Sequence, residues 1–135
     1  KMARFEGAVL QGAATTPVDE TNTASSVKSG SLDVFSTPSM IALMEQASCI
    51  AIEPALKEGE TSVGTAVTIS HLAPTPIGCT VTANAVAVAG TEREVTFEVS
   101  AVDSTGQKIG EGSHKRVVVK SDKFMQKANE KLAAK

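Results

Sequence analysis

From residue 62 to residue 119 the sequence alternates apolar and polar side chains in successive segments. The segments are 62–73, 79–89, 92–102 and 107–119, separated by short stretches such as PTPIG and DSTG. A two-residue period predicts strands with one buried face, and short connections predict antiparallel neighbours. We therefore expect one antiparallel sheet, which needs an apolar layer against its inner face.

Only one stretch of the chain is apolar enough to form that layer. Residues 34–56, VFSTPSMIALMEQASCIAIEPAL, predict a single long helix. At 100° per residue, one broad stripe of this helix is expected to face the core. The stripe contains Met40, Leu43, Met44, Ala47, Ile50 and Ala51.

The remaining segments complete an α+β architecture. Residues 5–18 predict a first strand broken at Pro17, and the Ser- and Thr-rich residues 19–31 predict an irregular segment or lid. Residues 121–135 predict a small amphipathic helix. We expect residues 1–135 to form a single domain in which an antiparallel sheet wraps around one central helix.

Composition excludes several classes of function. The chain has a net charge of −2, four Phe and neither Trp nor Tyr, which argues against a nucleic-acid surface. Its apolar runs are shorter than the roughly 20 residues that cross a bilayer. Cys49 and Cys79 stand in no metal-type spacing and are expected to be reduced thiols. We expect a cytoplasmic protein without a metal, a cofactor, a membrane or a nucleic-acid partner.

A carboxylate interrupts the apolar helix at Glu45. The angular positions place it beside Ile41 and Ile52, on the flank of the core stripe. If that flank is buried, desolvation would raise the pKa of Glu45 and the group would need a partner. The alternative is an ordinary surface Glu at a partly wet edge.

Thr37 and His71 each have two interpretations. Thr37 precedes Pro38, so its hydroxyl could cap the helix and contribute about 1 kcal/mol, or it could act in chemistry. Thr37 and Glu45 are about 12 Å apart along the helix axis, too far for a direct hydrogen bond. His71 is expected on one strand face with Val63, Thr65, Val67 and Ile69. It is either a core histidine or a proton-transfer group.

His114 and Arg116 are two residues apart and share one face of the last predicted strand. Such charges can protect an edge strand from aggregation, or they can donate to a phosphate or an oxyanion.

Three motifs resemble the fluoroacetyl-CoA thioesterase branch of the hotdog-fold thioesterases. They are VFSTPSMIALMEQASCIAI, GETSVGTAVTISHLAPTPIGCTVT and GEGSHKRVVV, in this order, and the similarity extends from about residue 32 to residue 126. The resemblance implies a hotdog fold and a homodimer, with larger assemblies left open, that has active sites at the subunit interface. It also implies an acyl-CoA substrate that is hydrolysed to free acid and CoA.

The resemblance also implies roles for individual residues. Thr37, Glu45 and His71 would form the catalytic set, with Glu45 as nucleophile or general base. Gly64 would offer a backbone group to the thioester carbonyl, and Arg116 would support the site.

One position departs from the family pattern. The fluoroacetyl-specific enzyme has a lid phenylalanine shortly before the helix, and the matching residue here is Ser31. A broader short-chain acyl-CoA thioesterase is therefore expected. Two alternatives are a non-catalytic protein that binds acyl-CoA or another small ligand, and an enoyl-CoA hydratase. The hydratase is the weaker alternative, because the central helix lacks the Asp-x4-His pair that hotdog-fold hydratases use.

Overall fold

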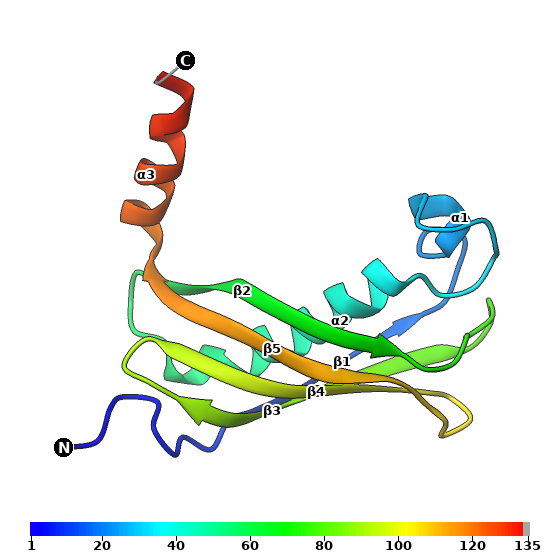
Figure 1. Cartoon of the computed structure of the whole chain (residues 1–135), viewed down its shortest axis with the longest axis horizontal. Coiled ribbons are helices and arrows are strands. Elements are labelled where there is room, and N and C mark those ends of the chain that lie inside the picture. The colour runs from blue at the N-terminus through cyan, green and yellow to red at the C-terminus, as the bar shows by residue number, and fades with distance from the viewer. Residues whose placement is uncertain (134–135) are drawn as a thin grey trace.

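The computed structural model describes residues 1–133, which form a curved five-stranded antiparallel sheet with one long helix across its inner face (Figure 1). The strands pair in the order β1-β3-β4-β5-β2 and span β1 Gln11–Pro17, β2 Glu60–His71, β3 Thr80–Gly90, β4 Glu94–Asp103 and β5 Lys108–Lys120. The helices are α1 Ala24–Val27, α2 Thr37–Ile52, the 3-10 turn η1 Glu53–Ala55, and α3 Ser121–Ala133. The predicted sheet around one helix is confirmed.

The segment before α2 and the C-terminal segment largely follow their predictions. The segment expected to be irregular contains only one helical turn, α1, which Thr23 caps by accepting from the Ser26 N–H. The C-terminal helix is confirmed through Ala133, and its last two predicted residues lie outside the described part of the chain. No helix of residues 1–133 is long and apolar enough to cross a membrane.

Helix α2 lies close to the sheet and makes most of its contacts with β1 and β3. Its buried residues are Met40, Leu43, Met44, Ala47, Ser48, Ala51 and Ile52. The prediction that Ile50 belongs to the core stripe is wrong, because Ile50 is 43% exposed while Ile52 is 1% exposed. The buried stripe is turned toward Ser48 and Ile52, so Ile50 falls just outside it.

A β-bulge changes the faces of β2. The register of β2 against β5 shifts between Gly64 and Ala66, where Gly64 pairs with Arg116 and Ala66 with Lys115. Because paired residues of antiparallel strands share a face, Gly64 is on the Arg116 side of the sheet. The shared face predicted for His71, Val67 and Ile69 holds, but Val63, which pairs with Val117, lies on the opposite side, and Thr65 is the bulged residue without a pairing partner.

Ser36, and not Thr37, caps α2. The Ser36 hydroxyl accepts a hydrogen bond from the Ser39 N–H at 3.1 Å, and the helix begins at Thr37. The prediction of Thr37 as the cap is therefore wrong, because the residue before it already fills that position. The Thr37 hydroxyl is left free for another partner.

This assignment predicts different effects for two neighbouring substitutions. Ser36→Ala should lower the free energy of unfolding by about 1 kcal/mol, because it removes the cap. Thr37→Val leaves the cap in place and should cost less. Urea denaturation followed by circular dichroism measures both, and a larger loss for Thr37→Val would return the cap to Thr37.

Candidate active site

The hydroxyl at the start of α2 meets the histidine at the end of β2. Thr37 Oγ1 lies 2.7 Å from His71 Nδ1, within hydrogen-bond distance. The two residues are 34 positions apart in sequence, and the contact forms because β2 ends beside the first turn of α2. The structure therefore brings together two of the three predicted catalytic residues.

The other ring nitrogen of His71 has no partner among the described residues. His71 Nε2 is buried and makes no hydrogen bond, although buried polar groups are nearly always paired. Partial burial lowers the pKa of His71 below its usual value. Near neutral pH the ring is therefore neutral and can accept a proton.

Glu45 lies at a second position, next to the bulge in β2. A Cβ atom on Gly64 would lie 3.0 Å from Glu45 Oε2 and 2.9 Å from His114 Cε1. Any larger residue at position 64 would therefore push into these side chains. The glycine lets a carboxylate, an imidazole and the guanidinium of Arg116 pack closely against the strand backbone.

Arg116 is buried and held by fixed acceptors. Its Nε donates to Ser62 Oγ at 2.8 Å, and its Nη2 donates to the Ser62 carbonyl oxygen at 2.9 Å. Its Nη1 lies 3.1 Å from His114 Nε2 and 3.9 Å from Glu45 Oε2. At 3.9 Å the contact with Glu45 is an ion pair without a hydrogen bond.

The contacts of His114 define its protonation state. Its Nδ1 lies 2.9 Å from the carbonyl oxygen of Ala66, which can only accept, so Nδ1 carries the proton. The Nε2 atom is then the acceptor for the Arg116 N–H. A neutral His114 thereby orients the guanidinium beside Glu45.

The predicted residues thus form two groups in one chain. Thr37 and His71 form the first, and Glu45, Gly64 and Arg116 form the second. Eight residues of α2 separate Thr37 from Glu45, about 12 Å along the helix axis. Among the described residues, no contact joins Glu45 to His71.

Ser62 and His114 were missed as site residues. The spacing of His114 and Arg116 placed them on one face, which was a usable signal for His114. The role of Ser62 depends on the pairing of β2 with β5, which is not visible in the local sequence.

The described residues contain no group of three or more His, Cys, Asp or Glu side chains that could hold a metal ion. The chemistry available here comes from the carboxylate, the imidazole, the hydroxyl and backbone N–H groups. These are the parts of an acyl-transfer site.

Comparisons with known proteins agree with this interpretation. The profile of the family FlK, described as fluoroacetyl-CoA-specific thioesterase, matches residues 18–122. A fluoroacetyl-CoA thioesterase from Streptantibioticus cattleyicolor is 41% identical over 102 residues, which cover 76% of this chain and 73% of the relative.

Solved structures are similar over most of the chain. A mutant of the thioesterase FlK in complex with acetyl-CoA has a TM-score of 0.85 and 34% identity, covering 92% of this chain and 98% of that chain. A hypothetical protein from Thermus thermophilus, described as a thioesterase superfamily member, has a TM-score of 0.84 and 27% identity, covering 94% and 96% of the two chains.

The fold and these similarities define a hotdog-fold thioesterase. Within that class, the chain belongs to the fluoroacetyl-CoA-specific thioesterase family. The predicted fold class and the resemblance are both confirmed.

The lowered pKa of His71 predicts how stability depends on pH. In the unfolded chain a histidine takes up a proton near pH 6.5, while the folded protein resists protonation of His71 until a lower pH. The free energy of unfolding should therefore fall as the pH drops below about 6.5, until the folded pKa is passed.

His71→Gln should reduce this loss, because it removes the titrating group. Urea unfolding of both proteins at pH 7.5 and pH 5.5 tests the prediction, and His114, the only other histidine, is present in both. Equal pH dependence in the two proteins would contradict it.

Proposed function

We propose that this protein hydrolyses short-chain acyl-CoA thioesters to the free acid and CoA, with Glu45, His71 and Thr37 as catalytic residues. The observation that carries the proposal is a partly exposed carboxylate beside a buried cation. Glu45 Oε2 lies close to the backbone of Gly64 and 3.9 Å from Arg116 Nη1.

Glu45 is suited to act as nucleophile or general base. Its side chain is 41% exposed, and no described residue makes a hydrogen bond to its carboxylate. By contrast, the carboxylates of Glu60 and Asp103 are occupied by hydrogen bonds. A free carboxylate can attack the thioester carbonyl or activate a water molecule for that attack.

Thr37 and His71 are suited to handle the charges that develop on the substrate. The hydroxyl of Thr37 sits in the first turn of α2, where free N–H groups and the helix dipole favour negative charge. We assign to these groups the stabilisation of an oxyanion or of the departing thiolate, and His71 passes to the thiolate the proton that the attacking water loses. In the second group, beside Glu45, we assign to the backbone of Gly64 a contact with the thioester carbonyl.

The segment before α2 supports a broad preference for small acyl groups. Ser31 is exposed, and residues 24–34 contain no aromatic side chain. Phe35, the nearest one, is 1% exposed and part of the core. We therefore propose that fluoroacetyl-CoA is not the dedicated substrate, although the family and its relative carry that name.

We also propose a homodimer. Strand β2 is the edge of the sheet, and residues 64–68 are all exposed. An open edge strand of this kind is a template for pairing with a second copy. Pairing there would place the groups around Glu45 and His71 at a subunit interface. The free thiols of Cys49 and Cys79 support a location in the cytoplasm.

Hydrolysis of acetyl-, fluoroacetyl-, longer-chain and aryl-CoA thioesters, followed by thiol release, tests the function. Glu45→Gln should lower kcat by roughly 100-fold or more for every substrate that is used, because it removes the base or nucleophile. Glu53→Gln, at the exposed first residue of η1, is the matched control and should keep wild-type turnover.

Thr37→Ser should keep most of the turnover, while Thr37→Val should not, because only Ser retains the hydroxyl. Binding of acyl-CoA without any turnover by the folded wild type would make the protein a binding module. Full activity of Glu45→Gln would remove Glu45 from the mechanism.

The dimer predicts a mass and a concentration dependence. Analytical ultracentrifugation should give at least twice the chain mass of 13.9 kDa. Specific activity should fall on dilution through the dissociation range, because each site would need both copies. A fully active species with the mass of one chain would contradict the dimer.

A further inference from the structure

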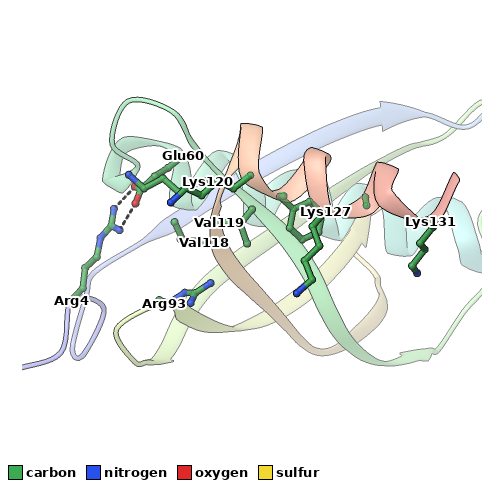
Figure 2. A pocket seen from close by; sticks show the side chains of 11 residues that line it. Arg4, Glu60, Arg93, Val118, Val119, Lys120, Lys127 and Lys131 are labelled. Atoms are coloured by element: carbon green, nitrogen blue, oxygen red, sulfur yellow. Dashed lines mark hydrogen bonds and ion pairs between the residues drawn. The ribbon is translucent and has the colours of Figure 1, made fainter. Parts of the chain in front are cut away.

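A basic groove lies between α3 and the end of the sheet, away from the groups described above (Figure 2). Its volume is about 670 Å³, within the range of small-molecule sites. Val118, Val119, Phe124 and Ala128 supply apolar surface inside it. Figure 1 shows that α3 projects from the end of β5 and away from the sheet, and this projection leaves the groove open.

Cationic side chains dominate the lining. They are Arg4, Arg93, Lys120, Lys123, Lys127 and Lys131, against the single carboxylate of Glu60. Those on α3 recur at positions 123, 127 and 131, a spacing that places them on one face of the helix, and Lys120 ends the preceding strand β5. This concentration of positive charge stands out in a chain whose net charge is −2.

The single carboxylate of the groove is already neutralised. Arg4 donates to both oxygens of Glu60 at 2.8 and 2.9 Å, and this pairing lowers the pKa of Glu60 to about 2. No described residue forms an ion pair with any of the other cationic side chains of the groove. They remain available to an anionic ligand.

The groove lies on the same pair of strands as the group around Glu45. Gly64 pairs with Arg116, and four residues earlier, at the start of β2, Glu60 pairs with Lys120. That separation is about 13 Å along the strand. Because side chains alternate, Arg116, Val118 and Lys120 point to one face of the sheet. The groove and the group around Glu45 therefore lie at neighbouring positions along β2 and β5.

We propose that this groove binds the phosphorylated nucleotide end of the CoA thioester. The inference rests on the proposed function and adds a binding site to it. CoA carries a diphosphate and a 3′-phosphate, which match the lysines and Arg93, and an adenine that can stack on Phe124. Phe124 is 43% exposed and lies on the same face of α3 as the lysines. The pantetheine arm would cover the distance to Glu45.

The α3 side of this site lies beyond the matched part of the family profile. The family profile ends at residue 122, whereas Lys123, Phe124, Lys127 and Lys131 follow it. Three of the six cationic side chains of the groove are therefore on the part of α3 that the profile does not cover. Asp122 and Glu130 are also on this helix, but neither lines the groove.

A double variant tests the groove without touching the catalytic groups. Lys123→Gln with Lys127→Gln changes exposed residues, so folding should be preserved. The control is Lys28→Gln with Lys115→Gln, which removes the same charge from exposed positions outside the groove. Each protein is assayed with acetyl-CoA and with S-acetyl-N-acetylcysteamine, a thioester that lacks the nucleotide and its phosphates.

The groove variant should raise KM for acetyl-CoA by about tenfold at low salt, with kcat unchanged. Turnover of the truncated thioester should be the same in all three proteins. An unchanged KM for acetyl-CoA, or an equal loss with both thioesters, would overturn the proposal.

Calorimetry with CoA and with 3′,5′-ADP separates this inference from the proposed function. If the wild type binds both ligands, the groove variant weakens both, and no thioester is hydrolysed, the groove is supported and the proposed function fails. If acetyl-CoA is hydrolysed equally well by all three proteins, the function is supported and the groove proposal fails.

Discussion

The close approach of α2 to the sheet is the constraint on which the site depends. At Gly12 in β1, a Cβ atom would lie 2.5 Å from the Ala47 carbonyl oxygen and 2.7 Å from the Ala51 nitrogen. Real side chains do not tolerate such distances, so a glycine is required where strand and helix meet. This contact sets the position of α2, and with it the distance from Glu45 to the bulge at Gly64.

A buried cation then defines the surroundings of that carboxylate. Arg116 would be costly to bury without acceptors, and Ser62 and His114 supply them. Because these bonds fix the guanidinium, the positive charge stays beside Glu45 without closing a hydrogen bond to it. Fixed charge next to a free carboxylate is the kind of preorganisation that favours charge development on a substrate. The basic groove extends the same positive field along β2 and β5.

Much of the fold could be predicted from the sequence, because the two-residue period and the single apolar helix are local signals. The details of the site were less accessible. Ser36 and Thr37 both carry hydroxyls before Pro38, and only the geometry of the first turn shows which one caps the helix. The bulge after Gly64 puts Val63 on the opposite face from His71 and leaves Thr65 unpaired, because an extra residue breaks the alternation. The Ser62–Arg116 contact joins residues 54 positions apart, beyond any local pattern.

We propose that the Thr37–His71 pair and the Glu45–Arg116 pair act on one thioester, although they are separate in the chain. A double-mutant cycle on kcat with Thr37→Val and Glu45→Gln tests it most directly. Residues that act as one unit give strongly non-additive losses. We expect the double variant to be about as slow as the slower single variant. A loss equal to the product of the two single losses would show independent action and contradict the account.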